Sequence, residues 1–342
     1  MTASWGKEYD PNSVADKLEA ARLAKPGGHI SVAVGEGVSF KGLEYHDYLV
    51  FLCSIVEFRG EIAALQKNRI VGQAVIRAAK RGKITAGSLL CAINELEQEY
   101  RKNPPQKLKM VTSISAAQKL SLRRATINGC SIVFGPKLPT RFSRLRKKML
   151  DGVRDRFAGE LPTDYMDVAV SVSARSDADA ADKALDAIDL LRGIWNLYFN
   201  RGRKILLSTK QLRPFNQFVL GPAHTLHVPS GKLATTLYWY QPEFQGPIRP
   251  FNPGESKASM MHRFTQRTRK RLATCKYGEE LARAIRRYTR ALDLADWESV
   301  FLRLWSILEQ LTSTGEGGYK VTIRRVSFLF EDRAYHRQIL SY

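Results

Sequence analysis

The chain has 342 residues, of which 44% are hydrophobic, and it carries a formal net charge of +21. This composition supports a sizeable core and excludes a wholly disordered protein. So large an excess of positive charge repels itself within a compact fold, and a polyanionic partner is the natural reason for it. We therefore expect RNA or another nucleic acid as the partner, ahead of an anionic membrane surface.

The four cysteines are widely separated and include no Cys-x-x-Cys pair. Their spacing supports neither a zinc site nor a disulfide framework, and it favours free thiols in a reducing compartment. The longest apolar run, residues 48–56, is far shorter than the ~20 residues that cross a membrane. We expect a cytoplasmic protein with no membrane segment, no metal and no cofactor.

The first 102 residues favour helices, because their apolar side chains recur at spacings of three and four. This pattern predicts helices over 14–24, 70–79 and 88–100, with a further apolar element over 45–66. The sequence Asn103-Pro-Pro ends the region, because proline cannot continue a helix.

From residue 106 to residue 245 the pattern becomes mixed. Asn128-Gly129 lies between two β-prone runs and predicts a hairpin over 125–134. Other patterns predict one long helix and three further strands, over 178–200 and over 167–173, 217–220 and 233–240. We therefore expect an α+β domain with an antiparallel sheet over residues 1–245.

A segment rich in proline and glycine then predicts a linker over residues 246–262, followed by a helical domain over 263–342. Within that domain an apolar stripe predicts one packed helix. The stripe consists of Leu294, Trp297, Phe301, Leu304, Leu308 and Leu311. Asp296 is its expected N-cap.

This helix reads Ala-Leu-Asp-x-x-Asp-Trp and then Phe-x-x-Leu-Trp-x-x-Leu-Glu-x-Leu. This sequence resembles the opening helices of prokaryotic HEPN domains of the Apea-like or Abi-like kind, most strongly over residues 283–342. The resemblance implies an all-α bundle, a homodimer formed through that bundle, and metal-independent endoribonuclease activity in antiviral defence or toxin systems. In that chemistry a histidine acts as general base and an arginine stabilises the charged transition state.

The Arg-x4-6-His motif of the family does not occur after residue 280. His336 is the only late histidine, and Arg333 lies just three positions before it. We therefore expect that the helical domain is incomplete here, truncated before the motif, and that this chain alone does not cleave RNA. No catalytic residue is assigned. The alternative is a non-catalytic protein that binds nucleic acid, dimerises, or senses an unknown ligand through its N-terminal domain.

Two basic clusters are the candidate RNA-binding residues, because arginine binds phosphate in bidentate geometry and stacks on bases. The C-terminal cluster consists of Arg267, Arg269, Lys270, Arg271, Arg283, Arg286, Arg287, Arg290, Arg324 and Arg325. The second basic patch consists of Arg141, Arg144, Arg146, Lys147 and Lys148. For Arg324 and Arg325, salt bridges to acidic neighbours are an equally good explanation.

Glu309 and a pair of histidines complete the candidates. The HEPN resemblance implies that Glu309 can orient an active-site arginine, but a structural role is favoured because the motif that supplies this arginine is missing. His224 and His227 lie between two prolines in a stretch that is not helical. In a strand their imidazoles point to opposite faces, so we do not expect a shared metal ion.

Overall fold

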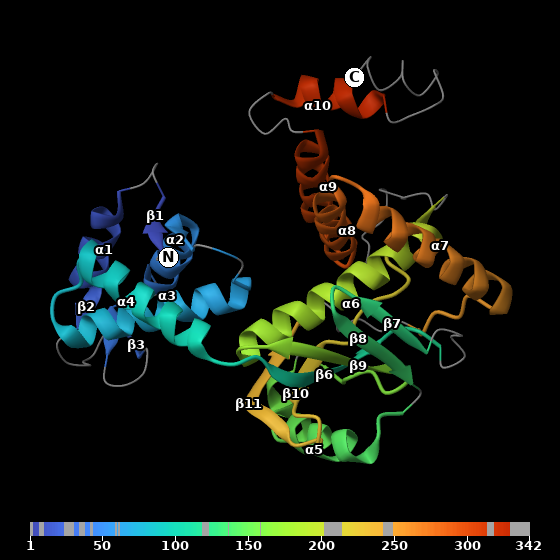
Figure 1. The fold of residues 1–342 in the computed structure, drawn as a ribbon, viewed down its shortest axis with the longest axis horizontal. Helices are drawn as coiled ribbons and strands as arrows, with labels where there is room; N and C mark the ends of the chain where they lie inside the picture. Colours follow the sequence, from blue (N-terminus) through green and yellow to red (C-terminus); the bar gives the residue numbers. More distant parts are fainter. Residues whose placement is uncertain are drawn as a thin grey trace. The chain divides into compact units, whose positions relative to one another are not determined.

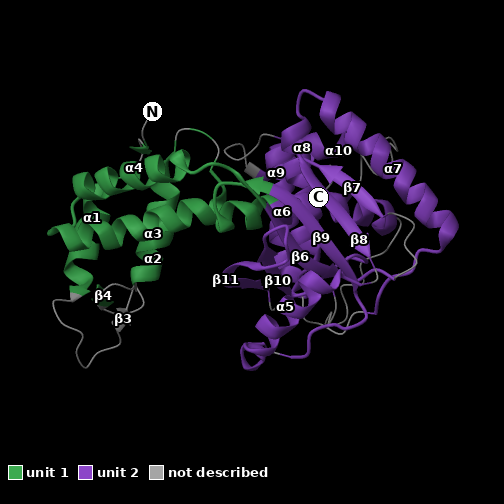
Figure 2. Cartoon of the chain, turned by 60° about the horizontal axis from the view of Figure 1, so that its bottom comes forward, with its two compact units in different colours: residues 1–107, 173–183 green, residues 108–172, 184–342 purple. Residues whose placement is uncertain are grey.

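The computed structural model describes residues 3–6, 10–23, 31–33, 38–41, 44–58, 60, 62–117, 123–135, 137–157, 159–201, 214–241, 249–312 and 318–328. The chain divides into two compact units (Figure 2). Unit 1 comprises residues 1–107 and 173–183, and unit 2 comprises residues 108–172 and 184–342. The boundary predicted at residue 245 does not coincide with this division, because the sheet and the C-terminal helices belong to one unit.

Unit 1 is mainly helical, as its apolar spacing predicts. Its helices are α1 (Pro11–Ala21), α2 (Glu44–Ile55), α3 (Ala64–Arg81) and α4 (Ala86–Lys102), joined by the first turns of α6 (Asp177–Asn200). Thr85 caps α4 by accepting a hydrogen bond from the Ser88 amide, while the Ser88 hydroxyl accepts one from the Thr85 amide. Apolar side chains of α3 and α4 form much of the core of this unit.

Short strands complete unit 1. Strand β1 (Ser4–Trp5) pairs with β5 (Val56–Glu57) in antiparallel fashion. Strands β2 (Arg22–Leu23), β4 (Ser39–Lys41) and β3 (Ser31–Ala33) form a second antiparallel sheet in that order. The helix predicted over 14–24 therefore ends earlier, at Ala21, and the chain turns into a strand.

Unit 2 contains a six-stranded sheet with the order β11-β10-β6-β9-β8-β7 (Figure 1). The strands are β6 (Gln106–Ile114), β7 (Arg124–Ile127), β8 (Cys130–Gly135), β9 (Met166–Ala174), β10 (Ala223–His227) and β11 (Leu233–Tyr240). Asn128 and Gly129 join β7 to β8 with φ angles of 47° and 73°, as a tight hairpin turn requires. The mixed α+β class, the hairpin and the strands over 167–173 and 233–240 are thus confirmed.

The strand predicted over 217–220 is wrong, because the chain instead forms β10 a few residues later. The amides of Gln217 and Phe218 both donate to the Asn196 side-chain oxygen, at 3.1 and 3.0 Å. A buried side chain of α6 thus takes the hydrogen bonds that a strand partner would otherwise accept. Leu220 retains one isolated bridge, to Ile114.

Helices cover both faces of the sheet (Figure 1). On one face lies α6, whose Trp195 ring contacts Phe134 and Phe218 with centroids 5.4 and 5.0 Å apart. On the other face α5 (Thr140–Asp151) inserts Phe142 against the His227 ring at 5.5 Å. A short 3-10 turn, η1, follows at Arg154–Arg156.

The C-terminal part of unit 2 is helical, as predicted. Its helices are α7 (Glu255–Thr274), α8 (Gly278–Leu292), α9 (Trp297–Thr312) and α10 (Gly318–Ser327). Helix α7 begins inside the predicted linker 246–262, of which residues 246–248 lie outside the described part of the chain. Residues 313–317 and 329–342 also lie outside it.

Helix α9 forms where the apolar stripe predicts it, but only part of the stripe is packed. Leu294, Trp297 and Leu304 pack against a core formed by Phe215, Leu292 and Val300. Phe301 and Leu311 of the stripe are exposed, whereas Ile307, which the stripe does not include, is buried. Apolar side chains occupy more than one side of this helix, so their spacing alone does not select the buried one.

Candidate nucleic-acid interface

Helix α7 separates an apolar side from a basic side. Ala258, Met261 and Thr265 are buried at spacings of three and four, and the Thr265 hydroxyl donates to the Met261 carbonyl at 2.8 Å. The Phe264 ring contacts Tyr198 of α6 at 5.4 Å, which fixes the rotation of the helix. Arg267, Lys270 and Arg271 consequently face away from the buried side, whereas Arg269 follows Thr265 by four positions and lies at its edge.

Four predicted RNA-binding residues lie near the end of α7. Arg267, Lys270 and Arg271 are exposed, and Arg269 is half-buried. None of the four forms an ion pair with a residue that the structure describes. The helix contains a single acidic residue, Glu255, in its first turn. These four residues, named the α7 cations below, are therefore available to an anionic partner.

The arginines of α8 are in a different situation, although they form the predicted stripe. Arg290 pairs with Asp186 at 2.6 Å and with Asp189 at 2.5 Å, both on α6. Arg286 is buried and pairs with Glu279 at 2.9 Å. The Glu279 contact lies within α8, but Arg286 also pairs with Asp186 of α6 at 3.7 Å. Arg286 and Arg290 thus both connect α8 to α6 and are removed from the candidate interface.

Arg287 is likewise engaged, since it donates to the Gln310 side chain and, at 2.8 Å, to the Ser306 hydroxyl. Its contacts join α8 to α9. Arg283 is exposed and is the member of the stripe that faces outward. The stripe that looked like one cationic surface is therefore mainly a set of internal helix contacts.

The remaining C-terminal candidates divide in the same way. Arg324 is exposed on α10, whereas Arg325 donates to the Thr312 carbonyl. Glu309 accepts a hydrogen bond from the Trp305 indole nitrogen at 2.8 Å, within α9. This contact agrees with the structural role favoured for Glu309, and Trp305 itself is half-buried.

The second basic patch lies on α5, and its members are not equivalent. Arg141, Arg144, Lys147 and Lys148 are exposed. Arg146 instead directs its guanidinium inward, and this group is enclosed although the residue keeps some surface exposure. It donates to the Ala223 and Val111 carbonyls at 2.9 and 3.2 Å and to the Thr225 hydroxyl at 3.1 Å.

Burial lowers the pKa of Arg146 to about 10, which still leaves it protonated at neutral pH. Its role is to tie α5 to strands β6 and β10, so it is removed from the patch. Three of the exposed members, Arg141, Arg144 and Lys148, line a hollow of about 450 Å³ together with Thr140 and Leu145. The α5 surface is thus a second cationic area.

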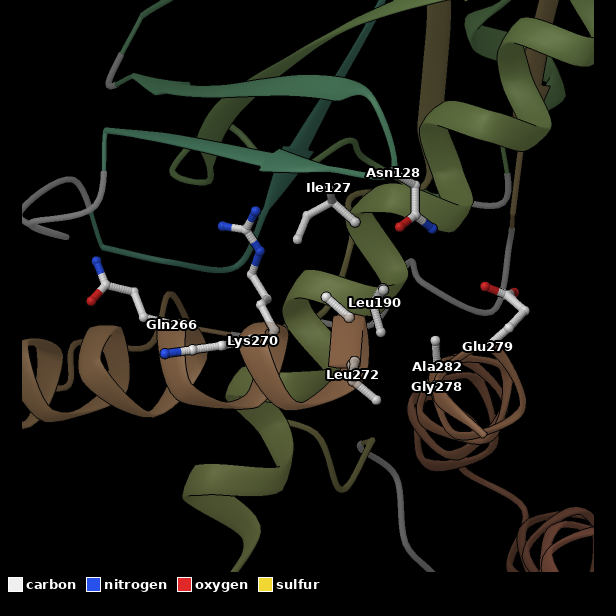
Figure 3. A pocket seen from close by; sticks show the side chains of 11 residues that line it. Ile127, Asn128, Leu190, Gln266, Lys270, Leu272, Gly278, Glu279 and Ala282 are labelled. Atoms are coloured by element: carbon white, nitrogen blue, oxygen red, sulfur yellow. The ribbon is translucent and has the colours of Figure 1, made fainter. Parts of the chain in front are cut away.

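A larger pocket lies beside the α7 cations. It has a volume of about 540 Å³ and is formed by the β7–β8 turn, α6, α7 and α8 (Figure 3). Its lining consists of Ile127, Asn128, Leu190, Gln266, Arg269, Lys270, Leu272, Ala273, Gly278, Glu279 and Ala282. Arg269 and Lys270 belong to the α7 cations, so the exposed basic side of α7 continues into this pocket.

Close approach of two helix ends shapes one wall of the pocket. A side chain at Gly278 would place its Cβ 1.9 Å from the Leu272 carbonyl oxygen, so only glycine fits there. On α8 the next residue, Glu279, is already paired with Arg286, which offsets its charge. The pocket therefore keeps a positive balance from Arg269 and Lys270.

Sequence reasoning missed Asn128 and Gln266 as site residues. At Asn128 the sequence predicts a turn but not a binding site, and at Gln266 the surrounding basic residues are the only feature of the pattern. The pocket brings the α7–α8 junction together with the β7–β8 turn and α6, which are distant in the chain, so no local spacing reveals it. The helical period does place residues 266, 269, 270 and 273 on one side of α7, and this was the one usable signal.

The two histidines of β10 have separate partners. His224 Nδ1 lies 2.7 Å from the Thr112 hydroxyl, and His227 Nδ1 lies 3.0 Å from the Gly231 carbonyl. Among the residues that the structure describes, no group of three or more metal-ligating side chains is found. In the same part of the chain, no helix has the length and apolar character needed to span a membrane.

Comparisons with known proteins give no indication of the function, so the candidate interface rests on the geometry described above. No family model, no curated protein and no solved structure matches the chain.

Proposed function

We propose that this chain binds RNA, as a single strand, through the α7 cations Arg267, Arg269, Lys270 and Arg271. The observation that carries the proposal is the contrast between two adjacent helices. The arginines of α8 are mostly engaged with acids and amides of the fold, whereas the α7 cations have no ion-pair partner among the described residues. Contacts within the fold therefore account for the α8 arginines but not for the α7 cations.

Electrostatics favours a polyanion as the partner. Four adjacent cations repel one another, and a phosphate backbone both removes this repulsion and releases its condensed counterions. The net charge of +21 adds a long-range attraction for any nucleic acid. The exposed cations of α5 add a second positive area, on the other face of the sheet.

The resemblance to HEPN domains makes RNA the favoured nucleic acid. Arginine side chains also suit a single strand, because their guanidinium planes stack on unpaired bases while binding phosphate. A homodimer and a role in antiviral defence or as a toxin enter the proposal through the resemblance alone. The proposal assigns binding to these residues and no cleavage step, because the Arg-x4-6-His motif is missing after residue 280.

The test compares two variants that lose the same charge. One replaces the four α7 cations with Ala, and the other replaces four exposed lysines of unit 1, Lys17, Lys83, Lys102 and Lys107, with Ala. Affinity for a fluorescent single-stranded RNA is measured by anisotropy at one fixed salt concentration.

We expect the α7 variant to lose affinity by about tenfold or more, because it removes phosphate contacts. The unit 1 variant should change affinity by no more than about threefold, through net charge alone. Equal losses in both variants would overturn the proposal, since they would show that binding depends on total charge and not on α7.

A further inference from the structure

We propose that the pocket between α7, α8 and the β7–β8 turn binds one nucleotide, with its phosphate on Arg269 and Lys270 and its base on the apolar floor. This inference rests on the proposed RNA-binding function and assigns a distinct subsite to it. The same chemistry would also admit a free nucleoside monophosphate, and the experiment below separates the two sources.

The size and the floor of the pocket suit a small planar group. A volume of about 540 Å³ falls within the range of small-molecule sites, which runs from ~300 to ~1,000 Å³. Ile127, Leu190 and Leu272 supply apolar side chains from three different elements (Figure 3). Such surfaces favour a group that is flat and weakly hydrated, such as a base.

The polar groups of the pocket are arranged for two different tasks. Asn128 projects from the hairpin turn and Gln266 from α7 (Figure 3). Each carboxamide offers both donors and an acceptor, which is what reading the edge of a base requires. Gln266 is oriented by His262, whose Nε2 lies 2.9 Å from the Gln266 nitrogen.

Charge decides where a phosphate would lie. Arg269 and Lys270 have no ion-pair partner among the described residues, whereas the one carboxylate of the lining, Glu279, pairs with Arg286 at 2.9 Å. A phosphate therefore meets two available cations on the α7 side and an offset negative charge on the α8 side. This asymmetry orients a nucleotide with its base toward the floor and the hairpin turn.

The experiment uses the full chain and a matched pair of lysines on α7. Lys270→Gln removes a cation at the pocket, and Lys257→Gln removes one from the first turn of the same helix. The two positions are about 20 Å apart at 1.5 Å per residue. Binding of each of the four nucleoside 5′-monophosphates and of inorganic phosphate is measured by NMR titration.

We expect at least one nucleoside monophosphate to bind more tightly than inorganic phosphate. Lys270→Gln should weaken that binding by about fivefold or more, while Lys257→Gln should leave it unchanged. In parallel, saturating monophosphate should lower the affinity for single-stranded RNA, which identifies the pocket as a subsite of the strand. Monophosphate binding without such competition would instead assign the pocket to a free nucleotide and overturn the subsite.

A second variant tests the base. Asn128→Gly keeps the turn, because glycine readily adopts the positive φ at this position, and it removes the carboxamide. Its ranking of the four monophosphates should differ from that of the native chain.

The inference is overturned if inorganic phosphate binds as well as every nucleotide, or if Lys270→Gln and Lys257→Gln behave alike. Its failure is distinguishable from failure of the proposed function. If the α7 variant loses RNA binding but the native chain binds no monophosphate, the proposed RNA-binding function is supported and only the nucleotide pocket is contradicted.

Discussion

At the scale of single residues, His224 shows how burial fixes a protonation state. Its ring is fully buried, with Nδ1 2.7 Å from the Thr112 hydroxyl and Nε2 3.3 Å from the Gln241 side-chain oxygen. A neutral imidazole satisfies both contacts by accepting at Nδ1 and donating from Nε2. Desolvation lowers the pKa of His224 to about 4, with the Gln241 hydrogen bond opposing the shift.

This shift predicts a pH dependence of stability. The unfolded chain binds a proton at His224 near pH 6.5, whereas the folded chain binds it only near pH 4, so the free energy of unfolding should fall as pH drops through this window. The loss should reach roughly 3 kcal/mol and stop near the lower value. Urea unfolding between pH 4 and 7 measures it, with His224→Gln as the control.

The slope of stability with pH should be shallower in His224→Gln over the same window, because the variant loses the His224 contribution, while His227, whose pKa burial also lowers, still contributes in both proteins. Parallel curves for the two proteins would contradict the buried neutral histidine.

Arg144 and Arg146 show what composition cannot reveal about single residues. Both belong to one basic run, yet one is exposed and the other donates three hydrogen bonds into the sheet. The run therefore predicts a cationic helix correctly in outline. It does not say which cations hold the fold, because that depends on the strands beneath α5.

At the scale of elements, the junction of α7 and α8 positions the candidate site. Gly278 begins α8 so close to Leu272 that an added Cβ would meet the Leu272 carbonyl oxygen. Gly278→Ala should therefore force the two helix ends apart and destabilise the protein by about 1–3 kcal/mol. Thermal unfolding measures the effect.

Gly87→Ala in α4 is the matched control, since its nearest neighbour would be the Thr85 hydroxyl at 3.9 Å. Alanine is a better helix former than glycine, so this variant should be neutral or slightly stabilising. If both substitutions had the same effect, the close contact between α7 and α8 would not exist as described.

The elements themselves were largely predictable from local patterns. The Asn-Gly turn, the alternation in β9 and the long apolar helix α6 each have signals within one element, and each occurs where predicted. The exposure of part of the α9 stripe and the position of β10 were not predictable. The first depends on which apolar side chains of α9 meet Phe215 and Leu292. The second depends on Asn196, distant in sequence, whose side-chain oxygen accepts hydrogen bonds from the Gln217 and Phe218 amides.

At the scale of the whole molecule, the positive charge divides into an internal and an external part. Arginines such as Arg192 and Arg290 form ion pairs with Asp189 and Asp293, and these pairs join α6 to the end of α8. The α7 cations and the exposed side of α5 remain for a partner. A sum over the sequence gives the total charge, but only the fold separates these two parts.

The salt dependence of RNA binding tests the central claim most directly. For a single strand, log Kobs falls with log salt by about 0.7 for each phosphate contact. Anisotropy titrations from low to high salt should give a slope that is shallower by about 3 when the α7 cations are all replaced with Ala, because about four contacts are lost. An unchanged slope would contradict the account, since it would show that the α7 cations do not contact phosphate.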